Sequence, residues 1–147
     1  MPDSANSQHT HEAEPPAALD PHLPIGVASI DNEHHRLFEL LSRLKAMPDA
    51  APNSNEFTAV LCRLGIELPA HFRTEEAFIR SCGMPIAQVQ EHLEAHIEII
   101  CQFAELNLEL MYHNPLRADV LQMIGDWVTN HIRLHDLLLK DYLPTPP

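Results

Sequence analysis

The chain has 147 residues, about the size of one domain, and its 21 Asp and Glu against 9 Lys and Arg give a formal net charge of −12. This acidic balance excludes a basic groove for nucleic acid and a surface for anionic membranes. No window is apolar enough to span a bilayer, and the N-terminus lacks the basic start and apolar core of a signal peptide, so we expect a cytoplasmic protein.

The two ends of the sequence differ in composition from the middle. Residues 1–24 contain four acidic residues, no Lys or Arg and few large apolar side chains, so they cannot bury enough surface to offset the entropy of ordering. We expect a disordered tail over residues 1–24, a folded domain over 25–143 and a short C-terminal tail over 144–147.

Between residues 25 and 143 apolar residues recur at three- and four-residue steps, which predicts an all-α domain. The first helix should begin near Ser29 or Asp31, which can cap free backbone N–H groups, and end before Pro48. Three more helices should follow, from Asn53 or Asn55 toward Gly83, from about Pro85 to His113, and from about Leu116 to Tyr142. Short connections make successive helices antiparallel, which predicts an up-down-up-down four-helix bundle.

Several positions carry more specific expectations. Pro69 lies inside the second helix and should kink it, because proline removes a backbone hydrogen bond. In the fourth helix the inward apolar positions are predicted to be Val120, Ile124, Trp127 or Val128, Leu134 and Leu138. The three cysteines, Cys62, Cys82 and Cys101, are odd in number and lie in apolar periodic segments, which indicates reduced, buried thiols.

Polar residues interrupt the inward stripes of all four predicted helices. They are His34, His71, Glu75, His92, His96 and His131. Burying several imidazoles and a carboxylate without compensation costs a few kcal/mol each, a large part of an ordinary domain's stability of roughly 5–15 kcal/mol. A common partner must therefore satisfy them together.

The spacing of these residues indicates a metal site. His71 with Glu75, and His92 with His96, are i, i+4 pairs whose side chains project side by side from one helix face. Imidazole and carboxylate donors without cysteine suit iron, with zinc as the main competitor, and a bundle core is a known place for a di-metal centre.

Four segments together carry a family resemblance: "IDNEHHRLF", "HFRTEEAFI", "HLEAH" and "WVTNHIRLHD". In order and spacing, residues 25–142 resemble the bacterial hemerythrins, which bind dioxygen at a non-haem di-iron centre. By this resemblance one iron is held by His92, His96 and His131, the other by His34 and His71, and both are bridged by Glu75, Asp136 and an oxo or hydroxo group. Counting about six positions per iron, this set leaves the second iron one ligand short, which is where dioxygen binds in this family.

Asp136 does not lie on the bundle-facing stripe, because five residues after His131 is about 140° around a regular helix. Its role as a ligand therefore requires a local irregularity between these two residues, such as a π-type turn or a partly unwound last turn.

The expected function is reversible dioxygen binding for storage, delivery or sensing, without catalytic residues. Five histidines and two carboxylates favour binding over oxygen activation, for which bundle enzymes commonly use four Glu and two His. An enzyme that reduces nitric oxide or peroxide at the same vacancy is one alternative. An iron- or redox-responsive module is another.

The surroundings of the expected site are less specified by the sequence. The oxygen pocket could be walled by Phe38, Phe72, Ile79, Trp127 and Leu134, which equally suit an ordinary core. His35 and His135 should lie on outer faces.

The third helix carries an acidic line, which we interpret mainly as a solvated face and alternatively as a docking surface for a basic protein. Its members are Glu91, Glu94, Glu98, Glu105 and Glu109.

Overall fold

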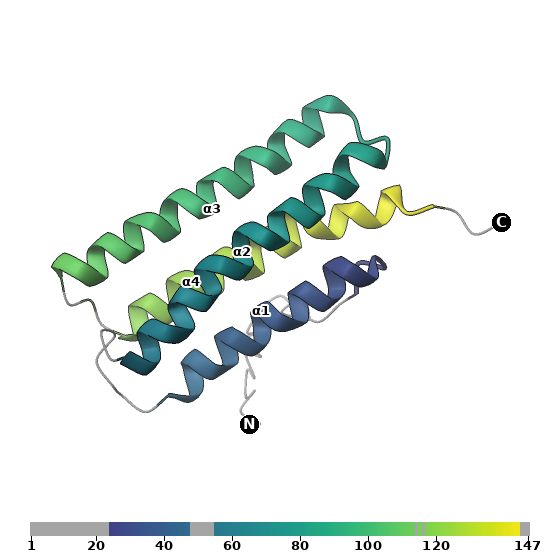
Figure 1. Cartoon of the computed structure of the whole chain (residues 1–147). Helices are drawn as coiled ribbons and strands as arrows, with labels where there is room; N and C mark the ends of the chain where they lie inside the picture. Colours follow the sequence, from purple (N-terminus) through teal and green to yellow (C-terminus); the bar gives the residue numbers. More distant parts are fainter. Residues whose placement is uncertain (1–23, 48–54, 114, 116, 145–147) are drawn as a thin grey trace, which may run out of the picture.

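The computed structural model of the chain describes residues 24–47, 55–113, 115 and 117–144. They form the elements α1 (Ala28–Ala46), α2 (Asn55–Ser81), α3 (Ile86–Tyr112) and α4 (Arg117–Leu134), followed by the 3₁₀-helix η1 (Asp136–Tyr142). Figure 1 shows the four long helices lying roughly along one direction. Most of the two predicted tails, and a helix start at Asn53, fall outside the described residues.

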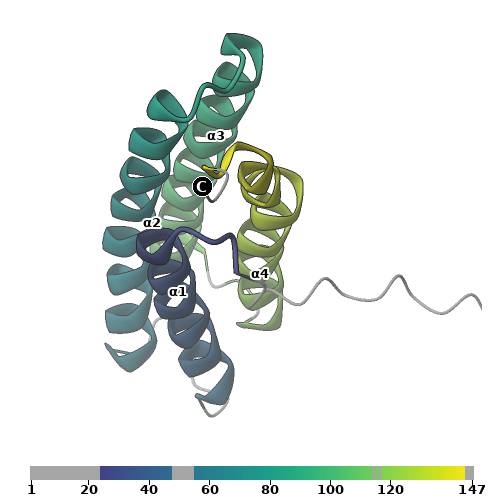
Figure 2. The same cartoon turned by 90° about the vertical axis from the view of Figure 1, so that its right-hand side faces the viewer.

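The helices form a closed antiparallel bundle. Each helix contacts the next one along the chain, and α1 also contacts α4, so every helix has two neighbours (Figure 2). The described residues contain no strand. The predicted all-α, up-down-up-down bundle is therefore confirmed. None of the helices in these ranges is both long enough and apolar enough to cross a lipid bilayer.

α1 starts next to Ser29, as predicted, but the capping of this helix differs from the prediction. The helix begins at Ala28, and Val27 precedes it without a side-chain cap, so neither Ser29 nor Asp31 is the capping residue. Asp31 instead accepts hydrogen bonds from the backbone N–H groups of Ile25 (2.7 Å) and Gly26 (3.1 Å). The φ of Gly26 is +102°, a conformation that favours glycine. Asp31 thus fixes the segment that leads into the bundle.

The predicted irregularity after His131 is present. α4 ends at Leu134, and His135, with φ −121° and ψ −52°, separates it from the 3₁₀-helix that begins at Asp136. Leu134 and Leu138, which were predicted to face inward, are 55% and 51% exposed.

These two errors have a physical cause. The buried apolar residues of α4 recur at steps of four, Val120, Ile124, Val128 and Ile132. Each step of four shifts the buried stripe by about 40° around the helix axis. By the end of α4 the stripe therefore lies on a different side of the helix from Leu134. The break at His135 then changes the phase again, and Leu139 becomes the buried residue of η1.

Two apolar clusters occupy the core, one on each side of a polar layer. The larger cluster includes Leu37, Leu64, Ile99 and Val128, and the smaller one consists of Ile25, Ile30, Ile79, Val89 and Leu139. Along α1, α2 and α3, and from α4 into η1, the polar residues lie between members of the two clusters; on α1, for example, His34 separates Ile30 from Leu37. Apolar packing thus holds the polar layer from both ends.

The prediction of buried cysteines is wrong. Cys62 and Cys101 are exposed and Cys82 is half-buried, and all three are free. Cys62 and Cys101 lie in apolar stretches of α2 and α3, but on the sides of these helices that face away from the core. The apolar pattern therefore marks two sides of these helices, of which only one is buried.

Pro69 lies within α2, which continues as one helix on both sides of it. The proline ring provides no N–H group, so the carbonyl of Gly65 loses its usual partner four residues on. The predicted kink at this point stays a prediction.

Candidate metal centre

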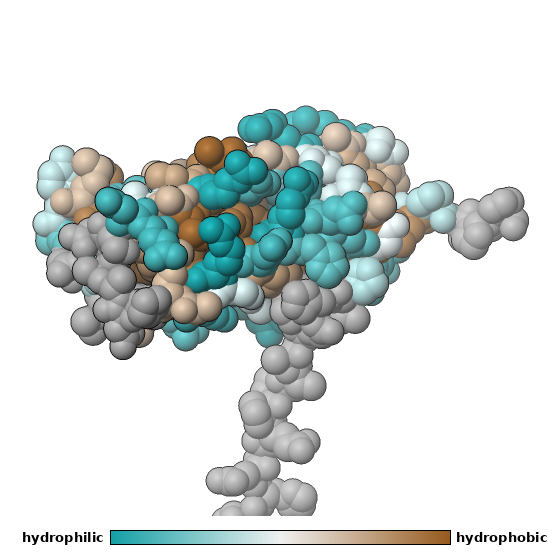
Figure 3. Space-filling model, turned by 60° about the horizontal axis from the view of Figure 1, so that its bottom comes forward, coloured by the Kyte–Doolittle hydropathy of each residue, from teal (hydrophilic) through white to brown (hydrophobic). Residues whose placement is uncertain are grey.

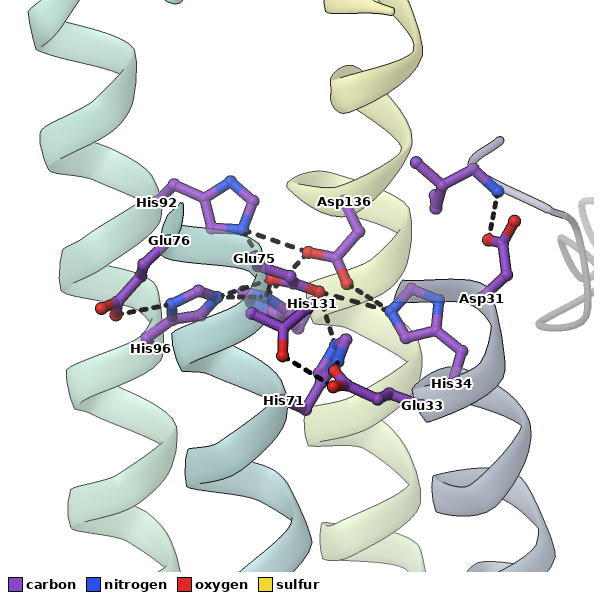
Figure 4. A network of polar contacts seen from close by, with 12 residues as sticks. Asp31, Glu33, His34, His71, Glu75, Glu76, His92, His96, His131 and Asp136 are labelled. Atoms are coloured by element: carbon purple, nitrogen blue, oxygen red, sulfur yellow. Dashed lines mark hydrogen bonds and ion pairs between the residues drawn. The ribbon is translucent and has the colours of Figure 1, made fainter. Parts of the chain in front are cut away.

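Seven polar side chains converge in the layer between the two apolar clusters. α1 supplies His34, α2 supplies His71 and Glu75, α3 supplies His92 and His96, α4 supplies His131, and η1 supplies Asp136. All seven are at most 5% exposed, and Figure 4 shows them pointing toward one another from all sides of the bundle. The structure thus brings together all seven residues that were predicted as metal ligands.

The seven residues fall into two groups that could each hold a metal ion. One group is Glu75, His92, His96, His131 and Asp136, and the other is His34, His71, Glu75 and Asp136. Within each group the candidate ligand atoms lie within 4.8 Å of one another. The two carboxylates belong to both groups, whereas the imidazoles divide three to two.

Glu75 turns one oxygen toward each group. Its Oε2 lies 3.1 Å from Nε2 of His92 and 2.9 Å from Nε2 of His96. Its Oε1 lies 3.3 Å from Nε2 of His34 and also contacts Nε2 of His71. A carboxylate in this orientation can bind two cations at once.

Asp136 is arranged in the same way. Its Oδ1 lies 3.1 Å from Nε2 of His92 and 2.9 Å from Nε2 of His131, while its Oδ2 lies 3.0 Å from Nε2 of His34. The side chain reaches this position because the helix is interrupted at His135. Both carboxylates therefore connect the two groups.

Two glutamates outside the seven orient two of the imidazoles. Nδ1 of His71 donates to Oε2 of Glu33 at 2.8 Å, and Thr74 donates to the other oxygen of Glu33 at 2.6 Å. Nδ1 of His96 donates to Oε1 of Glu76 at 3.2 Å. Hydrogen bonds of this kind fix the tautomer in which Nε2 is free to bind a metal.

Neither glutamate was predicted from the sequence. Each directly adjoins a singled-out residue in the sequence, Glu33 before His34 and Glu76 after Glu75, so adjacency was the available signal. It was insufficient because neither glutamate bonds to the residue that it adjoins. Both reach a histidine on another helix.

The Nδ1 atoms of His34 and His131 are buried and have no hydrogen-bond partner in the structure. Leaving a buried polar group unpaired costs about 1–3 kcal/mol. These two rings are therefore not positioned by outer hydrogen bonds; their polar contacts are with the carboxylates and, for His131, with Nε2 of His96 at 3.0 Å.

The protonation of the metal-free site follows from these contacts. Burial lowers the pKa of His34, but the carboxylates of Asp136 and Glu75 outweigh burial and raise it to about 9. Burial also lowers the pKa of His131, but the contacts with Asp136 and Glu75 outweigh burial and raise this pKa to about 10. Burial and Glu75 raise the pKa of Asp136, but the histidines bring it down to about 2. In the metal-free site, protons on these imidazoles therefore provide the positive charge that a bound metal cation would otherwise supply.

His135 was predicted to lie on an outer face, and this prediction is wrong. It is half-buried, and its ring centre lies 5.5 Å from that of His92 and 5.3 Å from that of His131. Burial and the neighbouring imidazoles lower the pKa of His135. His35, in contrast, is exposed as predicted.

A cavity of about 10 Å³ adjoins the polar layer, beside His34, His71, His131 and Asp136. Its apolar lining consists of Leu37, Leu68, Phe72, Ile99, Val128 and Ile132. Only Phe72 among the five predicted wall residues is part of this lining. The other four lie elsewhere: Phe38 and Trp127 pack with the larger cluster, Ile79 belongs to the smaller cluster, and Leu134 is exposed.

Comparison with known proteins establishes the family. The family described as hemerythrin HHE cation binding domain matches residues 25–143, so the chain belongs to the hemerythrin HHE family of cation-binding domains. The chain is similar to a bacteriohemerythrin of Campylobacter jejuni subsp. jejuni serotype O:23/36, with 28% identity over 77% of this chain and 84% of that protein. A bacteriohemerythrin of Stenotrophomonas maltophilia is 26% identical over 81% of this chain and 76% of its own length.

Solved structures show the same fold. The crystal structure of a wild-type hemerythrin superposes with a TM-score of 0.67 and 24% identity, covering 81% of this chain and 90% of that chain. A mutant hemerythrin gives a TM-score of 0.65 over 79% of this chain and 87% of that one.

Proposed function

We propose that this domain holds two non-haem iron ions and binds dioxygen reversibly at one of them. The proposed ligands are His92, His96 and His131 for one iron, His34 and His71 for the other, and Glu75, Asp136 and an oxo or hydroxo group for both. Five imidazoles and two carboxylates without a thiolate fit iron, and zinc is the main competing metal. The orientation of the two carboxylates, with one oxygen toward each group, supports a bridged pair.

The unequal division of the imidazoles carries the functional proposal. With the same bridges on both sides, a six-coordinate iron is complete in the group with three imidazoles and one ligand short in the group with two. The small cavity adjoins both imidazoles of the smaller group, His34 and His71. Its volume of about 10 Å³ is near the minimum that one water molecule needs, so this position admits only a very small ligand.

The protein residues around the cavity favour binding over turnover. Bound iron would supply the electrons that dioxygen takes up on binding and returns on release. Apart from the proposed ligands, the described side chains that line the cavity are all apolar, so they exclude water and provide no proton donor. Storage, delivery and sensing of oxygen all use this chemistry.

The test is a visible absorption spectrum of the anaerobically reduced, iron-loaded chain, recorded after adding dioxygen and again after purging with inert gas. We expect a charge-transfer band that appears with dioxygen and disappears on purging. Immediate conversion to a stable oxidised spectrum, with steady consumption of nitric oxide or peroxide when an electron donor is supplied, would establish an enzyme instead. An unchanged spectrum on iron loading would overturn the di-iron proposal.

A further inference from the structure

A second apolar stripe runs along the outside of α3. It consists of Ile97, Cys101, Ala104, Leu108 and Met111, which follow one another at steps of four, three, four and three residues. All five are exposed, Ile97 by 61%, Leu108 by 54% and Met111 by 73%. Single exposed apolar residues are ordinary on protein surfaces, whereas a continuous stripe calls for a partner.

The spacing of this outer stripe indicates what kind of partner it fits. The buried side of α3 is formed by other residues, among them His92, His96 and Ile99, so the helix is apolar on two sides. Alternating steps of four and three keep a stripe on one face at a period of 3.5 residues, the repeat by which two helices pack against each other. The outer stripe therefore matches a further helix lying along α3.

A groove beside the outer stripe extends the apolar surface onto α2. It has a volume of about 550 Å³, and its walls include Ile66 and Pro69 from α2 and Ile100 and Phe103 from α3. Ile66 is 63% exposed. Gly65 allows Phe103 to lie close to α2, because a Cβ atom there would come within 2.8 Å of the ring. Side chains of a docked helix would have space in this groove.

The charges along the outer stripe select the partner. Glu98 and Glu105 directly follow stripe residues Ile97 and Ala104, at the flanking positions where charges determine which helices pair. Residues 86–112 contain five Glu and no Lys or Arg. The complementary helix therefore carries Lys or Arg beside its apolar residues.

We propose that the outer stripe of α3, with the adjoining groove, is the docking surface for a basic amphipathic helix of a partner protein. A second copy of the chain is a poorer occupant, because its α3 offers no cation to Glu98 and Glu105. Residues 1–23 of the same chain are also unsuitable, since they contain four acidic residues and no Lys or Arg.

The probe for this proposal is a synthetic helix with Leu at the a and d positions of each heptad and Lys at the others. A matched helix has Glu in place of Lys. Binding of each labelled peptide to the full chain is measured by fluorescence anisotropy. We expect binding of the Leu–Lys helix and none of the Leu–Glu helix.

Two pairs of variants locate the contact. Replacing both Ile97→Ser and Leu108→Ser should weaken binding of the Leu–Lys helix by about tenfold or more. The matched control, Met123→Ser with Leu138→Ser, changes two apolar residues that are 43% and 51% exposed elsewhere and should have no effect. All four residues lie at the surface, so both variants should fold, which circular dichroism checks.

The second pair tests charge. Glu98→Lys with Glu105→Lys should reverse the preference and bind the Leu–Glu helix. Glu39→Lys with Asp141→Lys changes the net charge equally at exposed sites on α1 and η1 and should keep the preference. Equal binding of both peptides, or equal effects of stripe and control variants, would overturn the proposal. So would a wild-type dimer in sedimentation equilibrium that the Ile97→Ser, Leu108→Ser variant abolishes, because the occupant would then be a second copy.

Discussion

Nε2 of His131 lies 2.9 Å from Oδ1 of Asp136, although the two residues are five positions apart. In a regular α-helix their side chains would diverge by about 140°. The end of α4 at Leu134 and the non-helical His135 remove this divergence. The interruption of the last helix thus determines whether one carboxylate or two face both groups of histidines.

Asp136→Asn should therefore lower the iron content of the loaded chain to well below two per molecule. The variant keeps the shape of the side chain and removes the negative charge that both groups share. Iron is measured by mass spectrometry of the desalted protein. Asp141→Asn, at an exposed position of the same 3₁₀-helix, is the control and should retain wild-type iron content. Full iron content in Asp136→Asn would contradict a bridging role.

His34→Ala should leave one tightly bound iron per chain. The variant removes one of only two imidazoles from the smaller group, while the group with three imidazoles keeps all its donors. The measurement is iron content after anaerobic loading and dialysis, with His113→Ala at the exposed end of α3 as the control. If His34→Ala lost both irons and kept its helix content, the two groups would not bind independently.

Glu33→Gln should weaken the iron at His71 by roughly 10- to 100-fold, as expected when the outer partner of a metal-binding histidine is lost. The amide can still accept a hydrogen bond from Nδ1 of His71, but it no longer carries the charge that makes the ring a stronger donor. Competition with a chelator measures the affinity of each iron. Glu39→Gln, on the exposed side of α1, is the control, and an equal loss in both variants would argue against the contact.

Val128→Leu should lower dioxygen affinity without changing iron content. Val128 lines the cavity of about 10 Å³ beside His34 and His71, and the added methylene group would fill it. Val120→Leu adds the same group at a buried position of the same helix away from the cavity. Dioxygen titration followed by visible absorption compares the two variants. Equal affinities would show that the ligand binds elsewhere.

The stability of the metal-free chain should depend on pH in two directions. The pKa values of His34 and His131 are raised from 6.5 to about 9 and about 10, so their contribution is complete below about pH 6.5 and is lost as the pH rises through 9 to 10. The pKa of Asp136 is lowered from 3.8 to about 2, so its contribution is complete above about pH 4 and is lost as the pH falls toward 2.

Urea denaturation of the metal-free chain measures this dependence. We expect the free energy of unfolding to be at least about 2 kcal/mol larger near pH 6 than near pH 10. Because Asp136 contributes to the shifts of both histidines, Asp136→Asn should flatten the alkaline part of the profile. A wild-type profile that is flat from pH 6 to 10 would contradict the geometry described for the site.

Much of the fold was predictable because it depends on interactions between residues that are close together in the sequence. The three- and four-residue period of apolar positions identified four helices, and the short connections between them imposed antiparallel neighbours. On Figure 3 hydrophilic and apolar residues lie side by side on the face toward the viewer, so the outer surface is not uniformly hydrophilic. The i, i+4 pairs His71 with Glu75 and His92 with His96 follow from helical geometry alone, and so could be placed together without coordinates.

Other features depend on how the helices are rotated and spaced. Glu33 reaches His71, and Glu76 reaches His96, across helix interfaces whose register no single helix specifies. The burial of Leu139 instead of Leu138 depends on the break at His135, which changes the phase of the chain.

The sequence by itself therefore determined the helices, the bundle and the six polar residues on the inward stripes, because helical periodicity acts over a few residues. Asp136 lies off the stripe and was expected only from the family resemblance. Only the tertiary structure decided which oxygen of Glu75 and Asp136 meets which histidine, which side chains line the cavity, and that a second apolar side of α3 stays exposed. Each of these outcomes depends on contacts between helices. An apolar residue such as Leu108 is exposed because α3 has more apolar surface than its two neighbours in the bundle can cover.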